Sequence, residues 1–231
     1  MSDPSFNCNL TRHNWHHQLK ADGWCKLPMP WIKNLNQRSV QLGRPKPNNS
    51  PYGVLDCGGG GDCFFHCVAH ALSEGASCIG AYCSDDIREM LCDTINEEDY
   101  ERMITNYRIM QDADDFEEDW DPHEVTTIDE FKDILRAGGG HWGDYQLLTH
   151  MTRTLRLNMV ILTHDEYGGE ISVYNTLQDH NVTYDTLVLL YENNCHFKLI
   201  GHFNGRRMIC NFTGSELPEE LLPEELLCSF A

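Results

Sequence analysis

The chain has 231 residues, of which 41% are hydrophobic and 23% charged, and its formal net charge at neutral pH is −19. This hydrophobic fraction is sufficient for a buried core and excludes wholesale disorder. The excess of acidic residues argues against a protein that binds nucleic acid through its phosphates, so we expect a partner that is neutral or basic.

The compartment is predicted from apolar runs and cysteines. No apolar run approaches the ~20 residues that a membrane helix needs, and the N-terminus lacks the apolar centre of a signal peptide. The eleven cysteines are odd in number and irregular in spacing, which argues against a disulfide framework. We expect a cytoplasmic monomer with no membrane segment, acting in a host cytosol if it is a viral or bacterial effector.

Residues 1–50 differ from the rest of the chain because they are rich in proline and asparagine and show no sustained period. They are predicted to be a partly irregular extension that ends in a linker or turn near 43–52. The extension also holds a group of histidines and cysteines whose spacing matches no known zinc motif, so surface polar residues are favoured over a metal site. These are Cys8, His13, His16, His17 and Cys25.

Helical patterns begin at Cys63 and continue through the middle of the chain. An apolar face of Phe64, Val68, Ala71 and Leu72 predicts a helix that starts at Cys63. Ser84 is a candidate N-cap for a second helix. Further helices are predicted from Thr126 or Thr127 to Gly138, and over Trp142–Arg156. The acidic segment 112–121 is predicted to be a solvated loop, although it could also meet a basic face of a partner.

Strand patterns follow in the second half. Five short runs of apolar or β-branched residues are separated by turn residues and are predicted to be strands. They are LNMVILT, EISVYN, TLVLLYE, HFKLIGHF and RMICNF. Helices followed by strands predict an α+β fold in which helices pack on a central mixed sheet. The last segment, 213–231, contains LPEEL twice, and we expect it to form short helical turns docked on the domain.

The stretch GGGGDCFFHCVAHAL, residues 58–72, combines a glycine run with a cysteine at the start of a helix. A helix N-terminus lowers the pKa of a thiol, because unpaired N–H groups favour the thiolate. Glycines with positive φ can turn their N–H groups inward to bind an anion, which is also the geometry of an oxyanion hole worth ~3 kcal/mol per donor. Cys63 is therefore a candidate nucleophile, and His196, at the start of a predicted strand, is its candidate base.

Three motifs in order resemble the ovarian-tumour (OTU) family of cysteine deubiquitinases over residues 52–202. Gly60-Gly61-Asp62-Cys63-Phe64-Phe65 is similar to the family's D-G-x-C helix start. Trp142-Gly143 opens a block similar to W-G-x-x-x-E-L, and Cys195-His196-Phe197 is similar to the family's histidine–aromatic pair.

This resemblance implies a papain-like fold over 51–212 and cleavage of isopeptide bonds at the C-terminus of ubiquitin or a ubiquitin-like modifier. Ubiquitin or polyubiquitin is then the partner, and no cofactor is needed. Cys63 carries over as nucleophile and His196 as general base. The backbone of Gly60, Gly61 and Cys63 carries over as the oxyanion hole, and Trp142 and Gly143 as part of the channel for the ubiquitin tail.

The third catalytic residue departs from the family pattern. The family places Asp or Asn two residues after the histidine, but Lys198 stands there, and lysine cannot accept a hydrogen bond from the imidazole. Some family members use an acid upstream of the cysteine, which makes Asp56 a candidate. Asn194, or no third residue, stays open. His202 with Asn204 is a rival base and orienter.

Two other interpretations of the site compete with a hydrolase. Lys198 also motivates an OTU-fold pseudoenzyme that binds ubiquitin without cleaving it. A metal site on Cys63, His66, Cys67 and His70 is disfavoured, because four ligands on one straight helix cannot reach one tetrahedral ion. A purely structural Cys63 would leave the glycine run without a reason.

Overall fold

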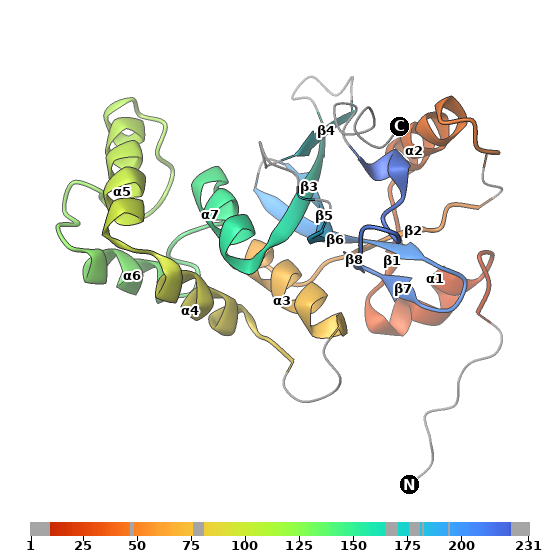
Figure 1. Cartoon of the computed structure of the whole chain (residues 1–231), viewed down its shortest axis with the longest axis horizontal. Coiled ribbons are helices and arrows are strands. Elements are labelled where there is room, and N and C mark those ends of the chain that lie inside the picture. Colours follow the sequence, from red (N-terminus) through yellow and green to blue (C-terminus); the bar gives the residue numbers. More distant parts are fainter. Residues whose placement is uncertain are drawn as a thin grey trace, which may run out of the picture.

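The chain folds into an α+β structure in which a mixed sheet lies between helices, as predicted (Figure 1). The structure is a computed structural model, and it describes residues 10–46, 49–75, 81–164, 171–175, 181, 183–193 and 195–222. In this part of the chain, no helix is long and apolar enough to cross a membrane.

The described strands form one sheet in the order β1-β2-β6-β5-β3-β4, with β7 beside β6 and β8 beside β5. The central strands β3 and β5 pair in parallel, whereas the other neighbours are antiparallel. The strands are β1 (Cys25–Lys26), β2 (Tyr52–Leu55), β3 (Leu157–His164), β4 (Ile171–Asn175), β5 (Asp185–Glu192), β6 (His196–Phe203), β7 (Met208–Ile209) and β8 (Asn211–Phe212).

Alternation along the central strands gives the sheet two apolar faces. On β5, Leu187 and Leu189 join one core, and Val188 and Leu190 join the other. The first face packs against a group of helices that Figure 1 shows at the left and below the sheet. They are α3 (Cys63–Gly75), α4 (Ser84–Thr94), α5 (Glu97–Asp112), α6 (Ile128–Arg136) and α7 (Tyr145–Leu155).

The second face is covered by the N-terminal segment. Helix α2 (Met29–Gln41) buries Trp31, Ile32 and Leu35 against this face. Residues 10–46 also contain α1 (Trp15–Gln18), the short 3-10 helix η1 (Leu19–Asp22) and β1, which extends the sheet. The partly irregular extension predicted for 1–50 therefore also contains regular elements that the sequence pattern did not indicate. Pro30 lies in the first turn of α2, where proline favours a helix because its missing N–H is not needed.

Other boundaries also differ from the sequence prediction. Cys83, not Ser84, is the N-cap of α4, whereas Thr127 caps α6 with Glu130 in a capping box. Helix α5 was not predicted, although the side chain of Asn96 caps it. Strand β2 was also missed, because its four residues are all buried and show no alternation.

The first LPEEL copy docks on the second face, beside α2. It forms the 3-10 helix η2 (Glu219–Leu221), which buries Leu221, and Leu222 behind it is also buried. Glu220 accepts hydrogen bonds from Tyr52 on β2 (2.7 Å) and from Arg44 after α2 (2.8 Å). The second copy, apart from Leu222, lies outside the described residues.

Candidate active site

Cys63 is the first residue of α3, and its side chain is buried against the start of β6. The Phe197 N–H donates a hydrogen bond to the Cys63 Sγ over 3.4 Å, and the thiol lies 4.0 Å from the Cys195 carbonyl oxygen. These two residues flank His196 in the chain. The structure thus brings the candidate nucleophile to the backbone on both sides of the candidate base.

His196 lies beside Asp56 because β2 and β6 pair antiparallel. Leu55 is paired with Leu199, so Asp56, the next residue, lies opposite Lys198. His196 is two residues from Lys198 along β6, so its side chain is on the same face of the sheet as that of Asp56 and diagonal to it. The imidazole Nε2 lies 3.1 Å from Asp56 Oδ1. This contact occupies Nε2 and leaves Nδ1 as the ring nitrogen that is free to exchange a proton.

Lys198 does not occupy the place of an orienting residue. Its Nζ lies 2.6 Å from Glu192 Oε2, a carboxylate from the neighbouring strand β5. The lysine therefore points to Glu192, and the carboxylate beside the imidazole comes from Asp56. Asn194 lies outside the described residues.

The glycine run forms a tight loop before α3. Gly60 and Gly61 have φ values of 76° and 91°, in the left-handed region that favours glycine. A Cβ on Gly61 would lie 2.8 Å from the Gly139 Cα and 2.9 Å from the Trp142 Nε1. Within the described residues, the N–H groups of Gly60 and Gly61 make no hydrogen bond. The loop thus offers free backbone donors next to Cys63.

A buried ion pair fixes this loop, and sequence reasoning missed it. Arg88 on α4 is fully buried, and its guanidinium contacts Asp62, the residue before Cys63 (Nε to Oδ1, 2.8 Å). Arg88 also donates hydrogen bonds to the Leu135 and His141 carbonyl oxygens over 2.6 and 3.0 Å. Its guanidinium stacks on the Phe65 ring, 3.8 Å from the centroid.

Asp62 links that pair to a second loop. Its Oδ1 also accepts a hydrogen bond from the Gly139 N–H over 3.3 Å. Arg88 and Asp62 thus hold the glycine loop against residues 137–142. A signal for Arg88 was present, since it lies on the apolar stripe of α4 between Ile87 and Leu91, where a charged residue needs a buried partner.

A cleft of about 360 Å³ opens in front of Cys63. Its lining includes Trp142 and Gly143, so the two predicted channel residues lie beside the candidate nucleophile. Trp142 is 46% exposed, and a Cβ on Gly143 would lie 2.6 Å from the Phe64 ring. Only glycine lets this segment pack so closely on α3.

Part of the acidic segment 112–121 also lines the cleft. Asp115, Glu117 and Glu118 face it, and Glu118 accepts a hydrogen bond from the Trp142 N–H over 3.0 Å. The interpretation of this segment as a merely solvated loop is therefore incomplete. Burial raises the pKa of Glu118, which the Trp142 N–H opposes.

The environment of the thiol differs from the expectation of a lowered pKa. Burial raises the pKa of Cys63, and hydrogen bonds from backbone N–H groups, that of Phe197 first, lower it only in part. The loss of hydration around a buried thiolate outweighs these donors. A base that removes its proton is then required for attack.

The rival site residues lie elsewhere. His202 is near the other end of β6, opposite Tyr52, and burial lowers its pKa to about 4. Asn204 accepts hydrogen bonds from the Arg206 and Arg207 N–H groups in a turn. Cys67 is buried, and its thiol donates to the Phe197 carbonyl. Among the described residues, no group of three or more His, Cys, Asp or Glu could hold a metal ion.

No protein-family model and no curated protein matches the chain. Solved structures to which it is similar include OTU domains. The OTU domain of OTUD1 has 16% identity and a TM-score of 0.44, covering 73% of this chain and 93% of that chain. An OTU deubiquitinase from Wolbachia pipientis wMel has 12% identity and a TM-score of 0.41, with coverages of 81% and 100%. The Hazara virus OTU bound to ubiquitin has 18% identity and a TM-score of 0.40, with coverages of 69% and 82%.

Proposed function

We propose that the chain is a cysteine-type deubiquitinase that hydrolyses the isopeptide bond at the C-terminus of ubiquitin or a ubiquitin-like modifier. The observation that carries the proposal is the contact of Cys63 with the backbone on both sides of His196, whose Nε2 lies 3.1 Å from Asp56. Ubiquitin as the substrate rests on the OTU-like motifs of the sequence.

In the proposed reaction, His196 accepts the thiol proton through Nδ1 as the Cys63 sulfur attacks the carbonyl carbon of the scissile bond. Asp56 holds the ring and stabilises the imidazolium that forms. The C–N bond then breaks, and the amine leaves with the proton from His196. Water, deprotonated by the same imidazole, hydrolyses the thioester and regenerates the thiol.

The transition-state charge develops on the carbonyl oxygen. The backbone N–H groups of Gly60, Gly61 and Cys63 are proposed as its donors, because the first two are unpaired within the described residues and the loop is fixed by Asp62. Trp142 and Gly143 are proposed to bound the channel for the modifier's tail.

We further propose that residues 51–212 form the catalytic domain of a cytoplasmic monomer. The preceding segment then acts as the cover of the sheet's second face, since α2 buries Trp31 and Leu35 there.

The test is labelling by a ubiquitin probe with an electrophile at its C-terminus. We expect a covalent adduct that disappears in Cys63→Ala, while Cys67→Ala, which removes a buried thiol one helical turn away, still labels. Cleavage of a panel of di-ubiquitin linkages then measures activity and linkage preference. Adduct formation that persists in Cys63→Ala would exclude this nucleophile.

A pseudoenzyme is the second candidate, and it is motivated by Lys198, which stands where the OTU family has the Asp or Asn that orients the histidine. It predicts that the protein binds ubiquitin but neither labels nor cleaves at any pH between about 6 and about 9, a range that runs from just below the ordinary histidine pKa of about 6.5 to just above the ordinary cysteine pKa of about 8.5. A labelling rate that rises with pH contradicts the pseudoenzyme.

A further inference from the structure

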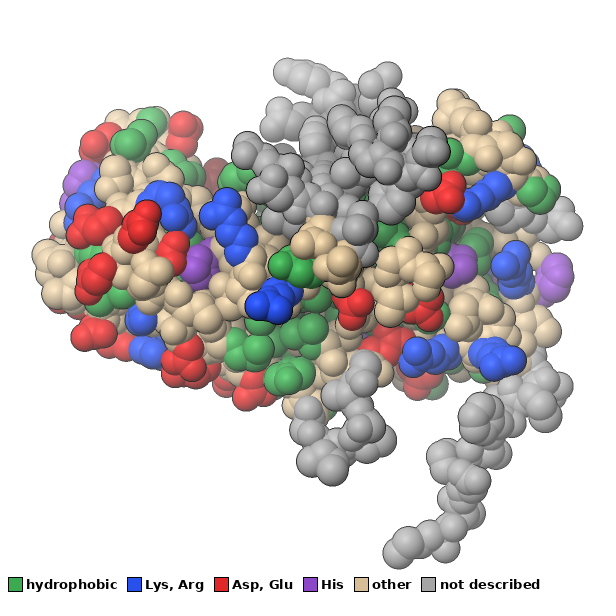
Figure 2. Space-filling model, in the orientation of Figure 1, with side chains coloured by type: hydrophobic (Ala, Val, Ile, Leu, Met, Phe, Trp, Pro, Cys, Tyr) green, Lys and Arg blue, Asp and Glu red, His purple; other side chains and the backbone are tan. Residues whose placement is uncertain are grey.

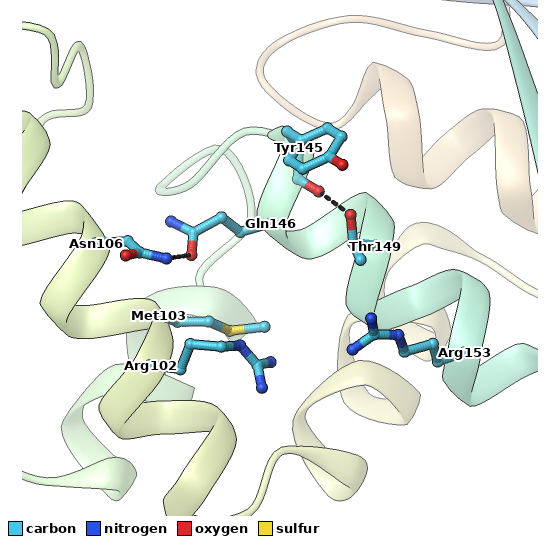
Figure 3. Close-up of a pocket in the computed structure, with 7 residues that line it drawn as sticks. All are labelled: Arg102, Met103, Asn106, Tyr145, Gln146, Thr149 and Arg153. Atoms are coloured by element: carbon cyan, nitrogen blue, oxygen red, sulfur yellow. Dashed lines mark hydrogen bonds between the residues drawn. The ribbon is translucent and has the colours of Figure 1, made fainter. Parts of the chain in front are cut away.

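A second pocket of about 250 Å³ lies between α5 and α7, apart from the cleft at Cys63 (Figure 3). Arg102, Met103 and Asn106 line it from α5, and Gln146 and Arg153 line it from α7. No residue in the described part of the chain lines both the pocket and the cleft. The two openings are neighbours, however, because α5 and the start of α7 border each of them.

The pocket concentrates positive charge in a chain whose net charge is −19. Figure 3 shows the guanidinium groups of Arg102 and Arg153 pointing toward one another from the two helices. Arg102 is paired with Asp99 over 2.8 Å, and no carboxylate in the described part of the chain pairs with Arg153. Two guanidinium groups that converge repel one another unless an anion lies between them.

A neighbouring histidine is affected by charges of both signs. Burial lowers the pKa of His150 on α7, the carboxylate of Asp99 raises it as the largest charge effect, and the positive charges of Arg102 and Arg153 lower it. On the face seen in Figure 2, basic side chains gather over α7 and the space beside α5, while acidic side chains dominate around α5 and α6. The positive charge is therefore local to the pocket.

A buried amide adds a hydrogen-bond donor. Gln146 Oε1 accepts a hydrogen bond from Asn106 Nδ2 over 2.9 Å, which fixes the orientation of the amide (Figure 3). Gln146 Nε2 is buried and has no hydrogen-bond partner among the residues that the structure describes. An unpaired buried donor is costly, so an acceptor from a ligand would stabilise this arrangement.

We propose that the α5–α7 pocket binds the carboxylate of an acidic side chain in a peptide segment of a protein partner. Arg153 and Arg102 would pair with the carboxylate. The rest of the pocket fits a peptide better than a free inorganic anion. Met103 forms an apolar floor, and the Tyr145 ring, 62% exposed, stands at the mouth and can cover a neighbouring apolar side chain.

This proposal does not depend on catalysis, so it is tested by binding to the full chain and to Cys63→Ala alike. The probes are the capped peptide Ac-Ala-Leu-Glu-Leu-NH2 and its Gln counterpart, titrated into ¹⁵N-labelled protein. We expect the glutamate peptide to shift amide resonances of α5 and α7. Replacing Glu by Gln in the peptide, or Arg153→Gln in the protein, should weaken binding about tenfold or more.

Two further variants separate the effect of the Arg153 charge on binding from an effect on folding. Arg153→Lys should keep part of the affinity, because it retains the charge but not the planar fork. Arg156→Gln, which removes an exposed arginine that does not line the pocket, should leave binding unchanged. Normal spectra of both variants exclude misfolding as the cause of any loss.

The proposal would be overturned by no shift with the glutamate peptide up to about 10 mM, by equal binding of the Glu and Gln peptides, or by unchanged affinity in Arg153→Gln. Tighter binding of inorganic phosphate than of the glutamate peptide would also overturn it, because the pocket would then be a site for free oxyanions.

Discussion

The two faces of the sheet each carry an arginine–carboxylate pair that joins segments far apart in the chain, but the pairs differ in burial. Arg88 is 1% exposed and contacts Asp62, which is 18% exposed. Arg44 is 41% exposed and contacts Glu220, which is 10% exposed. The first pair lies beside the candidate nucleophile. The second pair links the C-terminal segment to the residues that follow α2.

This difference determines what each pair does. On folding, Asp62 and Arg88 lose contacts with water and gain contacts with each other, and Arg88 also gains contacts with backbone carbonyls. If either partner were removed, the other would be a buried charge without an opposite charge beside it. Glu220 still has the Tyr52 hydroxyl if Arg44 is lost, and Arg44 can return to water. We therefore expect the face with the site to depend on buried charge and the opposite face to depend on apolar packing.

The largest effect is expected from Arg88→Met. It should lower the free energy of unfolding by about 3–5 kcal/mol, because Asp62 loses its partner. Without Arg88, Asp62 is no longer held in place against the Gly139 N–H, so the rate of labelling by the ubiquitin probe should also fall. Urea unfolding measures the first effect, and Arg44→Met is the matched control, with a loss of about 1 kcal/mol or less. Equal losses in the two variants would remove the distinction between the pairs.

The second face is tested by Trp31→Ala. Removing this fully buried ring should cost about 3–5 kcal/mol of unfolding free energy, since the cavity lies between α2 and the sheet. At temperatures where the variant stays folded, the labelling rate should match the parent. A labelling rate that falls as far as in Arg88→Met would show that the second face also shapes the site.

The orienting carboxylate is tested by Asp56→Ala. We expect the cleavage rate to fall about tenfold to a hundredfold, because the imidazole loses the group that positions it. Stability should change little, since the Asp56 side chain is 58% exposed. Asp56→Asn should keep part of the rate, and Asn204→Ala, in the turn after β6, should keep all of it. Full activity in Asp56→Ala would mean that Asp56 is not the third residue.

The smallest effect concerns acid stability and His202 on the second face. Burial lowers the pKa of His202 to about 4, with Glu220 opposing and Arg12 adding to the shift. A lowered pKa means that the unfolded chain binds the proton first, so this stability is present above pH ~6.5 and is lost as the pH falls toward 4. Urea unfolding between pH 8 and pH 4 should show a shallower loss in His202→Phe. An identical pH dependence of the variant and the parent would contradict this.

The sequence by itself determined the local elements with clear periodicity and the order of the motifs. Apolar spacing placed the helix at Cys63, and the branched runs placed β3, β5 and β6 within one or two residues. Prediction from the sequence failed where local signals conflict with the packing of the folded chain. The prolines before Trp31 were interpreted as irregular structure, although one of them starts a helix, and the fully buried β2 has no alternation to detect.

The partners of the site were decided only by the tertiary structure. Asp56 reaches His196 because β2 and β6 are neighbours in a register that no local pattern encodes, and 140 residues separate the two in the chain. Lys198 was interpreted as the loss of an orienting residue, but it pairs with Glu192 on the adjacent strand. Propensity and periodicity act over a few residues, whereas ion pairs and sheet registers join distant segments. The candidates Cys63, His196 and Asp56 were therefore predicted from the sequence, whereas the contact of Asp56 with His196 and the pairing of Arg88 with Asp62 came only from the fold.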